Sequence, residues 1–152
     1  MAAYAYTIAD IKSAGSRILN HDPTKKPGRG TLFFRSIRLD FDAIASKMSK
    51  TLTANDTFQL FDLAVGDIVL LVGMNVITAT TGAADCDIGY TGSTVDHHLN
   101  GYITNATTMA PTTGLPTGGP TYITTADTLD LITKTSTGAG GIVEVWALIG
   151  RI

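Results

Sequence analysis

The chain has 152 residues, of which 44% are hydrophobic and 16% are charged, and it contains one cysteine, Cys86. This length fits one domain with one sizeable core, and a single cysteine excludes an intrachain disulfide and a thiolate metal cluster. The low charged fraction, with threonine and glycine in its place, favours strands and turns over helices and makes the surface easier to desolvate against partners.

Charge is unevenly distributed along the chain, although the formal net charge is only −2. Residues 1–50 hold nine basic and four acidic side chains, whereas residues 51–152 hold two basic and nine acidic ones. This asymmetry favours contact of the leading segment with a neighbouring copy or another acidic protein. Nucleic acid is the competing partner. No aromatic row interleaves the basic side chains, however, and no reader motif is present, so we expect no nucleic-acid binding.

Residues 1–30 are expected to form an extended N-terminal arm, followed by a β-sandwich domain over residues 31–152. The arm lacks a strong hydrophobic period, apart from one short helix expected near residues 8–18, and its segments NHDP and KPGRG are typical of turns. Such an arm becomes ordered only against a partner, and a disordered leader is the alternative. We assign Arg17, Lys25, Lys26 and Arg29 to docking on that partner.

From residue 31 the hydrophobic pattern changes to a period of two. Phe33, Ile37, Leu39 and Phe41 share one face, with Arg35 as the exception. This alternation predicts a half-buried strand. Asp42 is expected to cap a short helix over residues 43–48.

Two further strands are predicted over residues 58–63 and 68–78, joined by a turn at residues 65–67. The second is apolar on both faces, with Ile68, Leu70, Val72, Met74 and Val76 on one and Val69, Leu71 and Ile77 on the other. A strand of this kind is either central in a packed sandwich or buried at a subunit interface.

Residues 84–90 alternate again, so Cys86 and Ile88 are expected inside and Asp85 and Asp87 outside. We therefore interpret Cys86 as a small core residue. A short strand is expected at residues 99–104. Residues 110–120, rich in glycine, threonine and proline, predict a loop or projecting ribbon.

The last strands are predicted over residues 121–124, 128–133 and 142–149. In the final strand Val143, Val145, Ala147 and Ile149 line one face, and Ile142, Trp146 and Leu148 dominate the other. Trp146 and Leu148 are candidates for self-association, and a plain core position is an equally good interpretation of Trp146. Seven or eight strands separated by turn signals predict an all-β fold, a jelly-roll-like antiparallel β-sandwich.

Several segments of this domain resemble small structural proteins of tailed-phage virions. They are LAVGDIVLLVGMNVIT at residues 63–78, YITTADTLDL at residues 122–131 and GGIVEVWALI at residues 140–149. The segment DCDIGY at residues 85–90 is similar to a strand that precedes a glycine-rich loop in that group. The resemblance covers residues 31–150, and its motifs are structural.

The resemblance to tailed-phage capsid decoration (cement) proteins implies a virion structural protein on the capsid surface. It also implies a homo-oligomer, a trimer, that binds between major capsid protein subunits and stabilises the phage head, with the arm reaching across neighbouring capsid subunits. Several modest contacts from one oligomer would give stable attachment. The sequence departs from the family pattern at Asp96, His97 and His98, where acidic or small loop residues are expected.

The sequence offers little for catalysis or metal binding. Asp85, Asp87, Asp96, His97 and His98 form the only cluster of ligand-like residue types. His97 and His98 are adjacent, so they point opposite ways in an extended chain, and no spacing matches a zinc site. No Ser–His–Asp set stands out, and Glu144 lies in a predicted core strand. We therefore expect no metal site, no cofactor and no catalytic residues.

A different kind of function remains as the alternative: a glycan-binding jelly-roll module of a tail fibre or other virion appendage. Tyr90, Tyr102 and Tyr122 are its candidate aromatic residues. Residues 1–9 do not resemble a signal peptide, and the apolar run at residues 68–77 is about half the length that crosses a bilayer. We expect synthesis in the host cytoplasm and no membrane partner.

Overall fold

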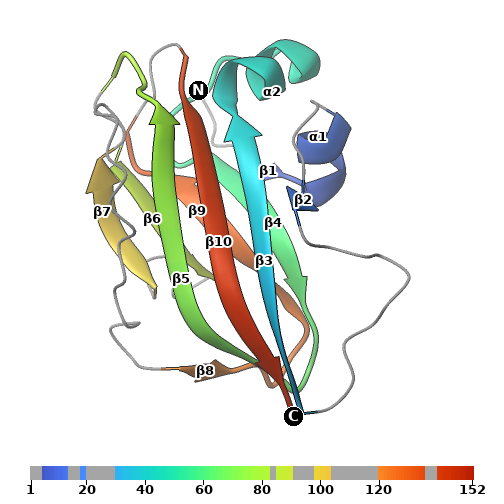
Figure 1. Ribbon diagram of the computed structural model, residues 1–152. Helices are drawn as coiled ribbons and strands as arrows, with labels where there is room; N and C mark the ends of the chain where they lie inside the picture. The colour runs from blue at the N-terminus through green and yellow to red at the C-terminus, as the bar shows by residue number, and fades with distance from the viewer. Residues whose placement is uncertain are drawn as a thin grey trace.

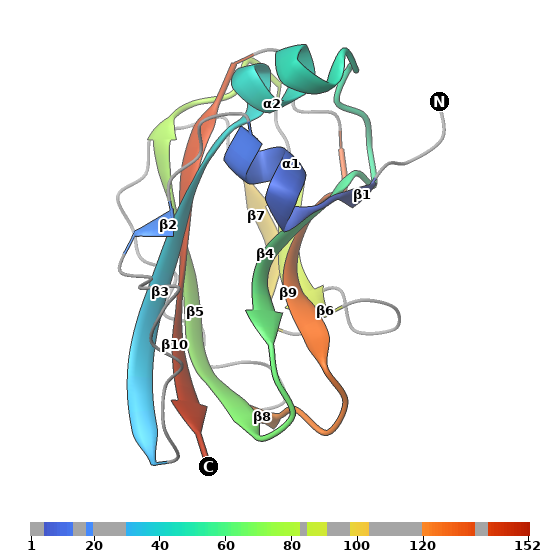
Figure 2. The same ribbon diagram turned by 90° about the vertical axis from the view of Figure 1, so that its right-hand side faces the viewer.

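In the computed structural model, two sheets pack face to face as a sandwich (Figures 1 and 2). The structure describes residues 5–13, 18–19, 30–82, 85–90, 98–103, 120–135 and 140–152. The all-β prediction is confirmed, since most of the regular structure within these residues is strand.

The strands in chain order are β1 (Ala5–Tyr6), β2 (Ile18–Leu19), β3 (Thr31–Asp40), β4 (Thr57–Leu63), β5 (Asp67–Thr78), β6 (Asp85–Tyr90), β7 (Leu99–Ile103), β8 (Thr121–Tyr122), β9 (Asp127–Thr133) and β10 (Ile142–Arg151). Helix α1 (Ile8–Ser13) follows β1, and helix α2 (Phe41–Met48) follows β3. One sheet has the order β1-β4-β9-β6-β7, and the other has the order β2-β3-β10-β5-β8.

The strands from β3 to β10 pair in a nested way. The outermost in sequence, β3 and β10, pair with each other, as do β4 with β9, β5 with β8 and β6 with β7, all antiparallel. Successive pairs fall in alternate sheets, which is the topology of a jelly roll. The predicted jelly-roll sandwich is therefore confirmed, and β1 is the exception because it pairs parallel with β4.

The core lies between the two sheets and follows the period of two. In β3 and β10 most inward side chains are fully buried, among them Ile37, Leu39, Val143, Val145 and Ile149. They face buried side chains of β4, β6 and β9, which include Phe58, Leu60, Cys86, Ile88, Leu129 and Leu131. Each fully buried large apolar side chain contributes about 1.5–3 kcal/mol, so these faces supply most of the stability.

Strand β5 departs from the predicted alternation at a β-bulge. Its register against β10 shifts so that Leu71 pairs with Leu148 while Val69 pairs with the next residue, Ile149. Val69 and Val72 are both buried as a result, whereas Leu70 is only half-buried. The prediction that Ile68 and Leu70 share a face with Val72 is wrong, because the inserted residue reverses the alternation at this point.

Helix α2 begins two residues earlier than expected. Asp40, in extended geometry at the end of β3, accepts a hydrogen bond from the backbone N–H of Ala43 at 3.0 Å and is the N-cap. Asp42 instead accepts from the backbone N–H of Gly140 at 2.7 Å. The prediction that Asp42 caps this helix is therefore wrong. Asp42 ties the helix to the start of the last strand.

The first part of the segment expected as an arm contributes to the core. Tyr6 and Ile11 are fully buried, and the Tyr6 ring stacks on Phe58 with a centroid distance of 4.7 Å. A capping box stabilises the N-terminus of α1. Asp10 accepts from the Thr7 N–H at 2.9 Å, and the Asp10 N–H donates to the Thr7 hydroxyl. Figure 2 shows α1 between β3 and β4. Residues 14–17 and 20–29 lie outside the described residues, so the domain boundary at residue 30 stays a prediction.

Candidate functional site

The outer face of β3, β10 and β5 carries an apolar surface. Leu148 of β10 lies between Phe34 of β3 and Leu71 of β5 in the cross-strand rows, and Leu32 lies on the same outer face. Leu32 is 63% exposed and Phe34 is 43% exposed. We call Leu32, Phe34, Leu71, Trp146 and Leu148 the apolar sheet face. Figure 1 looks onto it, and none of the labelled helices and strands lies in front of it.

Trp146 occupies the middle of the apolar sheet face. Its ring stacks on Phe34 with a centroid distance of 5.9 Å and an interplanar angle of 25°. The indole also lies flat over Gly73, where any Cβ atom would collide with the ring. Trp146 and Leu148 are half-buried and point away from the inter-sheet core, because their neighbours Val145 and Ala147 point into it. The structure thus places both self-association candidates on one outward surface, and the core interpretation of Trp146 is wrong.

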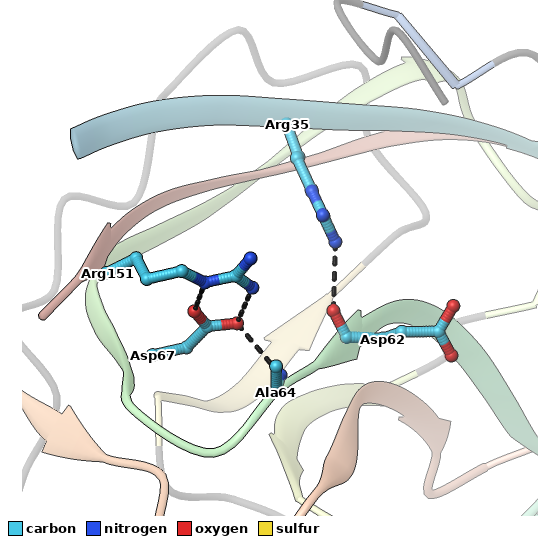
Figure 3. Close-up of polar contacts among 5 residues, drawn as sticks. All are labelled: Arg35, Asp62, Ala64, Asp67 and Arg151. Atoms are coloured by element: carbon cyan, nitrogen blue, oxygen red, sulfur yellow. Dashed lines mark hydrogen bonds and ion pairs between the residues drawn. The ribbon is translucent and has the colours of Figure 1, made fainter. Parts of the chain in front are cut away.

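A polar cluster lies at the end of the sandwich where the turn between β4 and β5 meets the end of β10 (Figure 3). Asp67 is fully buried there, and its two carboxylate oxygens accept from Nε and Nη2 of Arg151 at 2.6 and 2.8 Å. Its Oδ2 also accepts from the backbone N–H of Ala64 at 2.8 Å. The bidentate ion pair raises the pKa of Arg151 and ties the turn to the last strand.

Arg35 is the second cation of this cluster. It lies on the inward side of β3, at the one position that broke the apolar alternation in the sequence, and its Nη1 donates to the carbonyl oxygen of Asp62 at 2.9 Å. Burial, and then the charge of Arg151, lower the pKa of Arg35, while Asp67 and Asp62 oppose this. This cluster was not predicted from the sequence, although a charged residue at an inward strand position was its visible signal.

Cys86 is a core residue, as predicted. It is fully buried on the inner face of β6. Burial, together with the charges of Asp87 and Asp85, raises the pKa of the thiol to about 12. The thiolate, which is the nucleophilic form, is therefore scarce near neutral pH.

Asp85 and Asp87 were both expected to face solvent, but Asp87 is buried. Asp87 is only 3% exposed and lies 3.6 Å from the ammonium group of Lys134. The alternation itself is correct, since Asp87 lies on the opposite face from Cys86, but that face is covered at Asp87. Within the described residues, no group of three or more His, Cys, Asp or Glu side chains is placed to hold a metal ion.

His98 is buried and paired with a tyrosine. Its Nε2 forms a hydrogen bond with the hydroxyl of Tyr90, and the two rings meet edge to face with a centroid distance of 5.0 Å. Burial raises the pKa of Tyr90 to about 12. Of the three candidate glycan-contacting tyrosines, Tyr90 is thus unavailable and Tyr122 is exposed, whereas the side chain of Tyr102 lies outside the described residues.

Several predicted residues fall outside the part of the chain that the structure describes. These are Arg17, Lys25, Lys26 and Arg29 of the predicted arm, and Asp96 and His97, which precede β7 in the sequence. Among the described residues, no helix has both the length and the apolar character needed to cross a membrane.

No protein-family profile matches the chain, and no curated protein sequence matches it. Solved structures do match its fold. A chain of the cyanophage Pam1 capsid asymmetric unit aligns with a TM-score of 0.62 and 19% identity over 88% of this chain and 99% of that chain. A chain of the acid-stable capsid of Helicobacter pylori bacteriophage KHP30 aligns with a TM-score of 0.54 and 12% identity over 88% and 91%. A chain of the Ralstonia phage GP4 capsid aligns with a TM-score of 0.42 and 14% identity over 86% and 92%.

The first two alignments span nearly the whole of both partners, so they include both sheets of the sandwich. Their sequence identities are low, and what is shared is the three-dimensional arrangement. The chain therefore has a jelly-roll fold that also occurs in chains of phage capsid structures.

Proposed function

We propose that this chain is a structural protein of a tailed-phage virion and, more narrowly, a decoration (cement) protein of the capsid surface. It assembles as a homotrimer and binds between subunits of the major capsid protein. The observation that carries the proposal is the fold, which aligns over 99% of a chain of the cyanophage Pam1 capsid asymmetric unit. The sequence resemblance to small virion proteins, which is independent of that alignment, points the same way.

The apolar sheet face supports self-association. Leu32, Phe34 and Trp146 form part of a contiguous apolar surface on three neighbouring strands. Contiguous exposed apolar surfaces of this kind mark interaction sites in soluble proteins. Because Leu32 and Phe34 remain accessible in the single chain, contact with another subunit would remove them from water, with a gain of about 25 cal/mol for each Å² of apolar surface.

The mechanism follows from multivalency. One trimer presents three copies of each capsid-binding segment, so modest individual contacts combine into stable attachment. The basic residues Arg17, Lys25, Lys26 and Arg29 are assigned to these contacts, because the leading segment is basic while the rest of the chain is acidic. An acidic surface of the major capsid protein is the matching partner.

The test combines mass and binding measurements. Light scattering of the purified protein is expected to give three times the mass of the chain. The trimer is then expected to co-sediment with shells of the major capsid protein from the same phage. Changing Arg17, Lys25, Lys26 and Arg29 together to Gln should weaken co-sedimentation and leave the trimer intact. A monomeric protein that does not co-sediment would contradict the proposal.

A further inference from the structure

The positive charge of Arg35 is only partly offset by the carboxylates near it. Its guanidinium donates to the backbone oxygen of Asp62, which is neutral, and the Asp62 carboxylate points away from it (Figure 3). Within the described residues, no carboxylate lies at ion-pair distance from Arg35. Burial lowers its pKa because a desolvated cation is unfavourable, and the charges of Asp67 and Asp62 only partly oppose this.

Asp67 is already committed to another cation. Both of its oxygens accept from Arg151, and one also accepts from Ala64. The guanidinium groups of Arg35 and Arg151 both lie over the ring of Phe33, at 5.0 and 5.7 Å from its centroid. Asp67 is thus ion-paired with Arg151, and the guanidinium of Arg35 keeps donors for one further carboxylate.

Exposed apolar side chains gather at the same end of the sandwich. Val65 is at the tip of the turn between β4 and β5, Ile152 follows β10, and Tyr122 lies in β8 beside the start of β5. Backbone hydrogen bonds hold these segments together, since the Ile152 N–H donates to Gly66 and the Gly66 N–H donates to Ile123. Apolar side chains around a half-buried arginine are typical of protein–protein interfaces, where arginine and aromatic residues are enriched.

We propose that this end is a subunit interface at which Arg35 binds a carboxylate of a second copy of the chain. A second copy is the fitting occupant on charge, because residues 51–152 hold nine acidic and only two basic side chains. Among the described acidic side chains, Asp62, Asp85, Asp127 and Glu144 are exposed or partly exposed. A planar guanidinium can donate two parallel hydrogen bonds to one carboxylate. Arg35 uses one of its donors within the chain, so others remain for such a contact. A ring of three identical subunits joins two different surfaces at each contact, here a cationic end and an acidic surface. The inference rests on the proposed self-association and adds a contact at Arg35 to that of the apolar sheet face.

A zero-length cross-link tests this contact directly. In Arg35→Lys the new amine can be joined by a carbodiimide to a carboxylate in direct contact with it. Unlabelled and ¹⁵N-labelled copies are mixed before the reaction, so that mass spectrometry separates links between chains from links within one. A link between residue 35 of one chain and an Asp or Glu of another supports the proposal. Links only to Asp62 or Asp67 of the same chain, or no link, in a protein that is oligomeric by light scattering, would overturn it.

A second variant measures the strength of the contact. Arg35→Met keeps an unbranched apolar stem and removes the guanidinium with its charge, and it is expected to weaken self-association about ten- to a hundredfold. Lys47→Met, an exposed lysine of α2, removes the same charge away from this end and is expected to change it less than about twofold. Equal effects of the two variants would overturn the proposal while leaving trimer formation standing. A monomeric wild-type protein would instead contradict the proposed self-association itself.

Discussion

The ion pair between Arg151 and Asp67 makes a strong prediction about stability. Asp67 has a fully buried carboxylate, and the Arg151 side chain is 19% exposed. Arg151→Met would leave that carboxylate with the Ala64 N–H as the one partner found within the described residues. Removing one partner of a buried pair costs about 3–5 kcal/mol, mainly because the remaining charge is desolvated and uncompensated. We therefore expect the free energy of unfolding to fall by about 3–5 kcal/mol.

Urea unfolding followed by circular dichroism measures this loss. Arg38→Met is the matched control, since Arg38 is an exposed arginine of the neighbouring strand, and a surface change of this kind is expected to stay within about 0.5 kcal/mol. Adding Asp67→Asn to Arg151→Met removes the unpaired negative charge of Asp67, so the double variant should be more stable than Arg151→Met alone. If Arg151→Met loses no more stability than Arg38→Met, the reasoning from a buried, charged Asp67 is refuted.

Three further predictions concern other parts of the fold. Gly73→Ala places a methyl group where the Trp146 ring lies, so the tryptophan fluorescence is expected to shift to longer wavelength; an unchanged spectrum would count against the described stacking. The Cys86 thiol should resist an aromatic disulfide reagent at pH 8 until urea is added. Because its pKa rises from 9.0 to about 12 on folding, its contribution to stability is complete below pH 9 and is lost as the pH rises toward 12; Cys86→Val should flatten that decline. Asp40→Ala removes the N-cap of α2 and should cost about 1 kcal/mol in urea unfolding; no loss would contradict the cap assignment.

The strand pattern could be read from the sequence because burial between two sheets imposes a period of two. It placed Cys86, Leu129 and Val145 in the core correctly. The period of two did not predict the faces of β5 correctly, because a β-bulge shifts the alternation there. No residue type in the sequence marks the position of this bulge. Prediction from the sequence also failed at the start of α2, where Asp40 and Asp42 are equally good capping residues by type. Only the backbone geometry at Asp40 distinguishes them.

The candidate site was predictable in part. The outward direction of Trp146 and Leu148 follows from the inward direction of their neighbours, but the space above Gly73 that the indole fills depends on an adjacent strand far away in sequence. Arg35 was visible as a break in the alternation. Its relation to Asp67 and Arg151 could not be inferred, because it arises from three segments that only the nested pairing of strands brings together.

The pairing of β3 with β10 also determines what can be attached to this protein. The backbone N–H of Gly30 donates to the carbonyl oxygen of Arg151 at 2.6 Å, so the chain enters its first long strand beside the point where it leaves its last. A purification tag or fluorescent domain fused after Ile152 would start at the same end as Arg35 and Val65. At the proposed subunit interface, such a fusion would compete with a neighbouring copy for that surface. Labelling an internal turn at the opposite end, such as the one after α2, keeps the reporter and the assembly contacts apart.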